Sequence, residues 1–367
     1  MGLTSRTTET ALALLALGLP VGAVLLWSRV RGPRPVRVAQ RLGMVGLAQA
    51  CAVLLVFVVV NDQYVFFASW QDLLGTPAPV GQIVATGPAA HAAVRPAHAA
   101  DGGRLVEHVI RGTRSGVTGE ILVHLPQEYG SPAWAHRSFP VLELLSGWHS
   151  RPESLLGGLH LLDGMRKAES TGALQPVITV LPMINVALPR DTECTDVPGG
   201  PRVETWLTTD VRHYVATHFR ALMTPHSWSI GGYSTGGYCA VKLALHHPDW
   251  YPSAVSLAGY FYAVRDSTTG DLWGGSRTLR EHNSPLWLVT HRTPPAVDVL
   301  VFASRQDSDS WRSTEQFLRV ARPPLRTFGL LVQRGGHNYK TLRLALPEML
   351  AWMSAHVQGS GPAVHRA

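Results

Sequence analysis

A serine between two glycines is the residue of this sequence most suited to chemistry. Gly232-Tyr233-Ser234-Thr235-Gly236 matches G-x-S-x-G, in which a serine on a sharp turn between a strand and a helix acts as a nucleophile. The sequence predicts a strand before the motif, at 226–231, and a helix after it, at 236–247. Because the chain has 35 glycines, the pattern could also be a glycine-rich turn with an ordinary serine. The strand and helix around it favour the nucleophile.

A serine nucleophile needs a base to take its proton and an acid to orient that base. The acid and then the histidine are expected further along the chain. His337 follows two glycines beyond a strand expected at 327–333, and it is the predicted base, although the chain has 17 histidines. Asp307 follows a strand expected at 297–303 and is the predicted acid. Asp309 is the alternative, and whichever of the two is not used would be a loop carboxylate or a helix cap.

Acyl chemistry also needs donors for the developing oxyanion, typically backbone N–H groups. One is expected from Thr235, the residue after the nucleophile. The other is expected from the loop Ser146-Gly147-Trp148, which follows an early strand, and the N–H of Trp148 is the favoured donor.

Alternating strands and helices must position these residues. Residues 203–221 and 236–247 have helical apolar spacing, and a last helix is expected at 341–356, with Pro347 beginning a fresh turn. Strands are expected at 120–130, 139–147, 176–182, 226–232, 253–258, 297–303 and 327–333. This alternation predicts an α/β domain with a mostly parallel sheet and helices on both faces. Ligands of such sheets bind beyond the carboxyl ends of the strands, where the candidate residues are.

Two apolar runs near the start of the sequence are long enough to cross a membrane. Transmembrane helices are expected at about 10–28 and 42–60, since a hydrocarbon core of ~30 Å is crossed at ~1.5 Å per residue. The first run could instead be a signal peptide, and both could be buried core helices. The second run that follows the first, and the lack of charge in both, favour two spans.

The positive charge of the chain is concentrated between these two runs. The segment that joins them contains five arginines: Arg29, Arg31, Arg34, Arg37 and Arg41. The positive-inside rule places this short loop in the cytoplasm and everything after Val60 on the outer side of the membrane. Residues 1–41 carry +5 of the formal charge of +7, so the basic composition does not indicate a nucleic-acid partner.

Composition divides the chain into four parts. Residues 1–74 are the expected membrane anchor, whose aromatic-rich end, 61–74, suits the membrane interface or a short amphipathic helix. Residues 75–103 are rich in Pro, Ala and Gly and predict a linker. The catalytic domain is expected at 104–357, followed by a disordered tail at 358–367.

The cysteines and one acidic loop give weaker signals. At most Cys194 and Cys239 could pair, because Cys51 lies in an apolar run, and the spacing of the cysteines is not that of a metal site. No metal or organic cofactor is required by the expected chemistry. The loop 187–202 contains Asp191, Glu193 and Asp196, which could bind a cation or a substrate, although a solvated acidic loop is the favoured interpretation.

Longer stretches of the sequence resemble the esterase D family. They cover roughly residues 104–356 and include FPVLELLSGW, VETWLTTDVRHYVATHF, IGGYSTGGYCAVKLALHHPDWYPSAVSLAGYF and GGHNYKTLRLALPEMLAWM. That family includes S-formylglutathione hydrolase-like esterases, enterochelin esterases and the antigen 85 mycolyltransferases. The resemblance implies an α/β-hydrolase fold with a catalytic triad and an oxyanion hole. The matching positions are Ser234 as nucleophile, His337 as base, Asp307 as acid, and Trp148 and Thr235 as oxyanion donors.

The mycolyltransferases depart from this chain at positions that contact their sugar substrate. After the early strand they read Asp-Gly-Leu-Arg, where this sequence has Ser146-Gly147-Trp148-His149, and their acid is a Glu. We therefore expect a membrane-tethered, outward-facing serine esterase that forms an acyl-enzyme intermediate. The first alternative is a cell-envelope acyltransferase that moves an acyl group to a sugar or lipid hydroxyl. The second is an inactive envelope-binding module, against which the intact Ser, Asp and His set argues.

Overall fold

The chain divides into two compact units. The computed structural model describes residues 6–64, 70, 84–86 and 104–362. The first unit comprises Met1–Gly81 with the loop Arg334–Asn338, and the second comprises Gln82–Gln333 with Tyr339–Ala367. Most of the aromatic-rich stretch and of the predicted linker lies outside the described residues.

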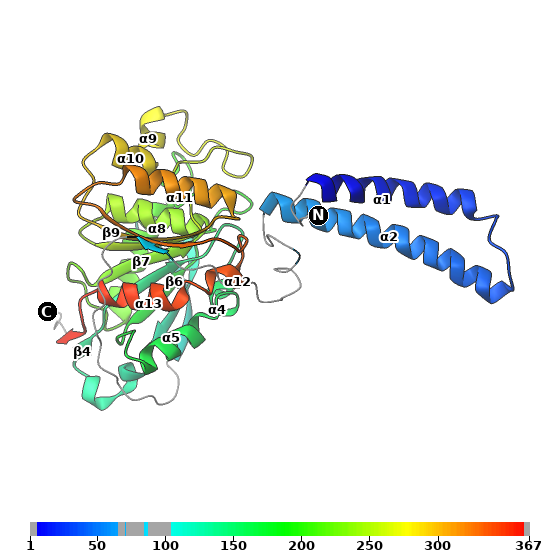
Figure 1. Ribbon diagram of the computed structural model, residues 1–367. Coiled ribbons are helices and arrows are strands. Elements are labelled where there is room, and N and C mark those ends of the chain that lie inside the picture. Colours follow the sequence, from blue (N-terminus) through cyan, green and yellow to red (C-terminus); the bar gives the residue numbers. More distant parts are fainter. Residues whose placement is uncertain (1–5, 65–69, 71–83, 87–103, 363–367) are drawn as a thin grey trace. The chain divides into compact units, whose positions relative to one another are not determined.

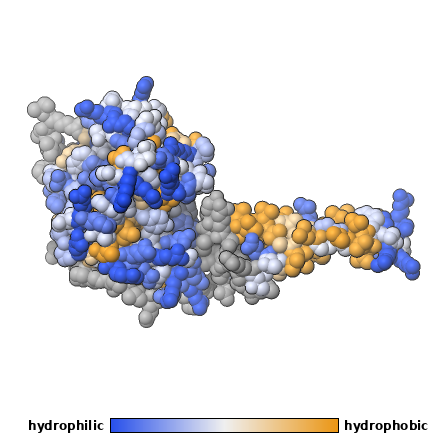
Figure 2. Space-filling view, turned by 90° about the horizontal axis from the view of Figure 1, so that it is seen from above, coloured by the Kyte–Doolittle hydropathy of each residue, from blue (hydrophilic) through white to orange (hydrophobic). Residues whose placement is uncertain are grey.

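Two long apolar helices form the N-terminal part of the first unit. Helix α1 spans Arg6–Leu26, helix α2 spans Arg34–Tyr64, and the two pack side by side (Figure 1). Both are long and apolar enough to cross a membrane, as predicted for 10–28 and 42–60. Figure 2 shows hydrophobic residues along this pair and hydrophilic residues at its loop end. Since α2 begins at Arg34, three of the five arginines lie on a helix rather than in the loop.

The second unit is built around one mixed sheet. In spatial order its strands are β1 (Val84–Thr86), β10 (Arg326–Val332), β9 (Asp298–Ser304), β8 (Ser253–Leu257), β7 (Trp228–Tyr233), β5 (Val141–Leu145), β6 (Ile178–Pro182), β3 (Thr118–Leu125) and β2 (Arg104–Arg111). The run from β10 to β6 is parallel, whereas β1, β3 and β2 are antiparallel to their neighbours. The prediction of a mostly parallel sheet is confirmed.

Helices cover both faces of this sheet (Figure 1). Helices α8 and α11 lie on one face, where Trp228 and Phe317 belong to one apolar cluster, and α5 and α13 lie on the other, where Leu142 and Met353 belong to a second. The helices are α4 (Glu153–Gly157), α5 (Leu161–Ser170), α6 (Val203–Thr205), α7 (Arg212–His218), α8 (Thr235–His246), α9 (Arg277–His282), α10 (Pro285–His291), α11 (Ser308–Val320), α12 (Tyr339–Leu342) and α13 (Leu346–Ala355). Short pieces complete the unit: the 3₁₀ turns η1 (Gln127–Gly130) and η2 (Pro132–Trp134) and the strands β4 (Arg137–Ser138) and β11 (Gly361–Pro362).

The expected elements are present with differences of detail, and the structure also has helices α4, α5, α9 and α10, which were not predicted. The helix predicted at 203–221 contains a π-helical turn, η3 (Trp206–Val211), between α6 and α7. The last helix is divided into α12 and α13, and Pro347 lies in the first turn of α13, as predicted. Strand β2 was not predicted, because its edge position leaves most of its side chains at least partly exposed and so removes a clear apolar alternation.

Two segments expected to lack structure make defined backbone contacts. In the tail predicted to begin at 358, the N–H of Gln358 donates to the carbonyl of His226, 2.7 Å away. Further on, β11 pairs with β4. In the predicted linker, β1 pairs with the outer edge of β10. Composition predicted a linker and a disordered tail, but Gln358, β11 and β1 have backbone hydrogen-bonding partners on the domain.

A disulfide crosslinks the acidic loop to a helix of the second unit. Cys194, after β6, is bonded to Cys239 on α8, which is the pairing that the sequence allowed. Cys51, on α2, is a free cysteine. The loop that follows β6 is therefore covalently attached five residues beyond Ser234 along α8.

A buried carboxyl lies in the centre of the sheet. Glu143 on β5 is fully buried between β6 and β7, and one of its oxygens accepts a hydrogen bond of 2.7 Å from the hydroxyl of Tyr251. Burial raises the pKa of Glu143 to about 7, although the Tyr251 hydrogen bond and the charge of Arg212 oppose the shift.

We expect Glu143→Gln to remove a pH dependence of stability. An unfolded Glu loses its proton near its ordinary pKa of 4.5, whereas folded Glu143 keeps it up to about pH 7. The unfolded state is thus favoured progressively as the pH rises from 4.5 to 7, by on the order of 3 kcal/mol, and no further above pH 7. Thermal unfolding of the full chain in detergent at pH 5 and pH 8 measures the effect. Glu348→Gln, at an exposed carboxyl on α13, is the control and should keep the wild-type slope, whereas equal slopes for all three proteins would contradict the expectation.

Candidate active site

Ser234 occupies a strained turn between β7 and α8. Its φ is +56° and its ψ is −121°, a conformation that non-glycine residues rarely adopt. Its N–H donates to the carbonyl of Leu257 on β8, at 2.9 Å, which fixes the turn against the neighbouring strand. Ser234 is partly exposed, whereas the residues on both sides of it are buried. The strand, turn and helix predicted around the G-x-S-x-G motif are all present.

The two glycines of the motif are required by close backbone contacts. A Cβ added at Gly232 would lie 2.3 Å from the carbonyl of Gly236. A Cβ added at Gly236 would lie 2.4 Å from the carbonyl oxygen of Leu145, at the end of β5. Neither distance is possible for a real side chain, because backbone atoms cannot move away as the end of a flexible side chain can. These positions therefore admit only glycine at this turn.

The loop that follows β5 lies beside Ser234. A Cβ added at Gly147 would be 3.3 Å from the Cβ of Ser234, so this loop and the turn are in contact. The N–H groups of Trp148 and Thr235 have no hydrogen-bond acceptor within the part of the chain that the structure describes. An oxyanion hole requires unpaired backbone donors of this kind beside a partly exposed serine.

The two candidate acids have different environments. Asp307 lies between β9 and α11, is 4% exposed, and accepts a hydrogen bond of 2.6 Å from the hydroxyl of Ser310. The side chain of Asp309, on the first turn of α11, is 84% exposed and lies 3.7 Å from Arg312. A buried, hydrogen-bonded carboxylate is held in one orientation, whereas an exposed surface pair is not. The environment of Asp307 is the one that suits a triad acid.

His337 lies on the loop Arg334–Asn338, which joins β10 to α12. Within this loop the N–H of Asn338 donates to the carbonyl of Gly336 at 2.9 Å. The next residue in the chain is Tyr339, whose ring centroid lies 5.2 Å from that of Tyr233, the residue before Ser234.

The acidic loop is buried, so the favoured interpretation of it as solvated is wrong for two of its carboxylates. Asp191 is 6% exposed and Glu193 is fully buried. Asp191 accepts hydrogen bonds from the hydroxyl of Thr235, at 3.0 Å, and from the N–H of Glu193, at 2.9 Å. Glu193 accepts from the hydroxyl of Tyr260 at 2.9 Å. Burial raises the pKa of Asp191 to about 6 and the pKa of Glu193 well above its ordinary value.

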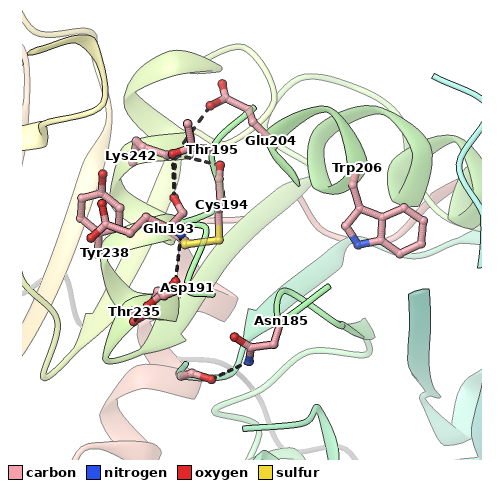
Figure 3. The surroundings of a disulfide bond; sticks show 12 residues. Asn185, Asp191, Glu193, Cys194, Thr195, Glu204, Trp206, Thr235, Tyr238 and Lys242 are labelled. Atoms are coloured by element: carbon pink, nitrogen blue, oxygen red, sulfur yellow. Dashed lines mark hydrogen bonds and ion pairs between the residues drawn. A yellow bond between two sulfur atoms is a disulfide. The ribbon is translucent and has the colours of Figure 1, made fainter. Parts of the chain in front are cut away.

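A buried lysine holds this loop in place (Figure 3). Lys242, on α8, donates to the carbonyls of Glu193 and Cys194, both at 2.8 Å, and to the hydroxyl of Thr195 at 3.1 Å. Sequence reasoning missed this residue, although a charged side chain in the apolar helix 236–247 was a usable signal. Asp196 differs from its neighbours in being partly exposed, and it accepts from the N–H of Thr205 at 2.9 Å.

The two buried carboxylates of this loop form hydrogen bonds within the protein. Both oxygens of Asp191 and both oxygens of Glu193 accept hydrogen bonds from the protein itself. In residues 6–64, 70, 84–86 and 104–362 no group of three or more His, Cys, Asp or Glu side chains could hold a metal ion. The contact of Asp191 with Thr235 instead links the loop to the turn that carries Ser234.

Comparison with known proteins places the chain in a family. The family model described as "Putative esterase" matches residues 115–354. A curated relative, an uncharacterized protein of Corynebacterium glutamicum, is 23% identical over 265 residues, covering 69% of this chain and 62% of the relative. The chain thus spans less than two thirds of the length of that relative.

Two solved structures are similar to this chain in fold. A ferulic acid esterase has a TM-score of 0.59 at 21% identity, covering 69% of this chain and 98% of its own. An S-formylglutathione hydrolase from Agrobacterium tumefaciens has a TM-score of 0.60 at 18% identity, covering 71% and 98%. With the family match over most of the chain, these findings lead to one conclusion: the chain belongs to the esterase family and has the α/β-hydrolase fold.

Proposed function

We propose that this protein is a membrane-tethered serine esterase whose catalytic domain lies outside the cell. The observation that carries the proposal is the strained, partly exposed Ser234, with the loop after β5 in contact with it. In a reaction of this class, Ser234 attacks the ester carbonyl and His337 takes its proton, while Asp307 orients the imidazole. The alcohol then leaves with a proton from His337, and water releases the acyl group from Ser234 by the same route.

The oxyanion of each tetrahedral intermediate would be bound by the N–H groups of Trp148 and Thr235. Both groups lack an acceptor in the described part of the chain, which leaves them available to a substrate oxygen. Removal of one such donor typically costs 10²–10³-fold in kcat. Donors that are fixed before the reaction lower the barrier because they need not reorient as charge develops.

Hydrolysis is favoured over transfer by the names of the fold neighbours. Both described neighbours, a ferulic acid esterase and an S-formylglutathione hydrolase, are named for hydrolytic reactions. The chain also lacks the Asp-Gly-Leu-Arg loop of the mycolyltransferases that it resembles, and has Ser146-Gly147-Trp148-His149 there. A serine esterase needs no metal or organic cofactor.

Three observations support the membrane location and the outward orientation. Helices α1 and α2 are apolar over a length that can cross a membrane. Five arginines, between positions 29 and 41, lie in the loop between the two helices and at the start of α2, as expected for a cytoplasmic end. The disulfide between Cys194 and Cys239 suits an oxidising compartment, which the cytoplasm is not.

We expect Ser234→Ala to abolish labelling by a fluorophosphonate probe, because the probe forms its bond with an activated serine oxygen. Hydrolysis of p-nitrophenyl esters by the full chain in detergent should fall by at least about 10³-fold. Ser170→Ala, at an exposed serine at the end of α5, should retain both labelling and hydrolysis. Labelling that persists in Ser234→Ala would rule out this nucleophile. Glycerol or trehalose added to the assay would yield an acylated product if the protein is a transferase.

The choice of acid is tested by a matched pair of variants. Asp307→Asn should lower kcat by roughly 10³–10⁴-fold, because the amide stabilises the wrong tautomer of the histidine and cannot stabilise its charged form. Asp309→Asn, two residues away and exposed, should stay within threefold of the wild type. Steady-state kinetics on one p-nitrophenyl ester measures both. The reverse order of effects would make Asp309 the acid.

The orientation is tested with alkaline phosphatase, which is active only after export. Fusion after Ala367 should give an active reporter, because everything after α2 is expected outside. Insertion of the reporter after Gly32 of the full chain, between α1 and α2, should leave it inactive, because all five neighbouring arginines are kept and hold that loop in the cytoplasm. An inactive reporter after Ala367 together with an active one after Gly32 would reverse the proposed topology.

A further inference from the structure

The loop beside Ser234 forms a tight turn with a strained residue. The N–H of Ser150 donates to the carbonyl of Gly147 at 3.1 Å, so Gly147–Ser150 is a hydrogen-bonded turn. Its third residue, His149, has a φ of +64°, in the left-handed region that favours glycine. Such a conformation persists only where the surroundings hold it. The turn therefore needs support from outside itself.

Asn185 supplies that support from the segment after β6. Its Nδ2 donates to the carbonyl of Gly147 at 2.9 Å and to the carbonyl of Ser150 at 2.6 Å. Both hydrogens of the amide are thus donated, one to the carbonyl of the first residue of the turn and one to the carbonyl of the last. Asn185 is 8% exposed, so water competes little for these carbonyls. Figure 3 shows its side chain directed toward the loop, with a dashed line to its partner.

The carbonyl that Asn185 holds belongs to the same peptide group as the N–H of Trp148. A trans peptide is planar, and its C=O and N–H point in opposite directions. Fixing the Gly147 carbonyl on Asn185 therefore directs the Trp148 N–H away from Asn185. The same hydrogen bond polarises the peptide group and strengthens its N–H as a donor. Gly147 itself lies against Ser234.

We propose that Asn185 is the positioning residue of the oxyanion hole, which acts by fixing the Gly147–Trp148 peptide so that the Trp148 N–H faces the reacting carbonyl. This inference rests on the proposed function, since it assigns a role in that reaction. Asn185 does not contact substrate in this role. Its effect is confined to states in which the oxyanion exists, so it changes kcat far more than KM.

The test replaces Asn185 with leucine, which is similar in size but donates no hydrogen bond. In the full chain in detergent, kcat for a p-nitrophenyl ester should fall by about 10²-fold, as for loss of one oxyanion donor, and KM should change less than threefold. A trifluoromethyl ketone, whose adduct with Ser234 carries an oxyanion, should lose affinity by the same factor as kcat/KM. A purely structural role would not produce this match.

Gln175→Leu is the matched control. Gln175 lies just before β6, at the end opposite to Asn185, and its Nε2 also donates to two backbone carbonyls, those of Ser354 at 2.8 Å and Val357 at 3.3 Å. Its loss should lower the Tm and leave kcat and inhibitor affinity within threefold of the wild type. If Asn185→Leu does not fold, Asn185→Ser, which keeps one short donor, should show a loss of about tenfold in both quantities.

The outcomes separate this inference from the function on which it rests. Wild-type protein that hydrolyses esters, with a folded Asn185→Leu whose kcat stays within threefold, overturns the role of Asn185 alone. A fall in kcat without a matching loss of ketone affinity also overturns it. Wild-type protein that neither reacts with fluorophosphonate nor hydrolyses esters overturns the proposed function, and the inference with it.

Discussion

The turn at Ser234 depends on backbones that approach more closely than any side chain would allow. Gly232 and Gly236 are in contact with each other, and Gly236 also lies against the end of β5. The positive φ of Ser234 costs on the order of 1–3 kcal/mol, which the hydrogen bond to Leu257 and the packing of the parallel strands must offset. The turn that carries the partly exposed Ser234 therefore requires β5, β7 and β8 to lie side by side in this order, as the core does.

A second constraint is the burial of charge behind this turn. Lys242 has no exposed surface, and burial lowers its pKa, although the charges of Glu204 and Glu193 oppose the shift. Its hydrogen bonds fix the loop that contains Asp191, whose carboxylate accepts from Thr235. Such a network stabilises one conformation only when every member has a partner. The disulfide from Cys194 to α8 restrains the same loop covalently.

The features that depend on a local sequence pattern were predicted from the sequence. The features that depend on contacts between residues far apart in the sequence were missed. The strands, the turn at Ser234 and the break at Pro347 follow from apolar runs, glycines and proline. Burial separates Asp307 from Asp309, but it results from the packing of α11, which two nearby aspartates in a sequence do not reveal. The acidic loop looked solvated because Lys242 is far from it in sequence. Asn185 belongs to no motif, so only its hydrogen bonds identify it.

Strand β1 also changes where the folded domain begins. Composition placed that boundary at 104, yet Val84–Thr86 pairs with Gly329–Leu331 on the outer edge of β10. An uncovered edge exposes a row of N–H and C=O groups, which is a template for pairing with another chain. A shortened protein that starts at 104 would keep every residue of the proposed triad, but the outer edge of β10 would have unpaired N–H and C=O groups. The N-terminal boundary of a separated domain should therefore be chosen from the hydrogen bonds of β1 and not from the composition of residues 75–103.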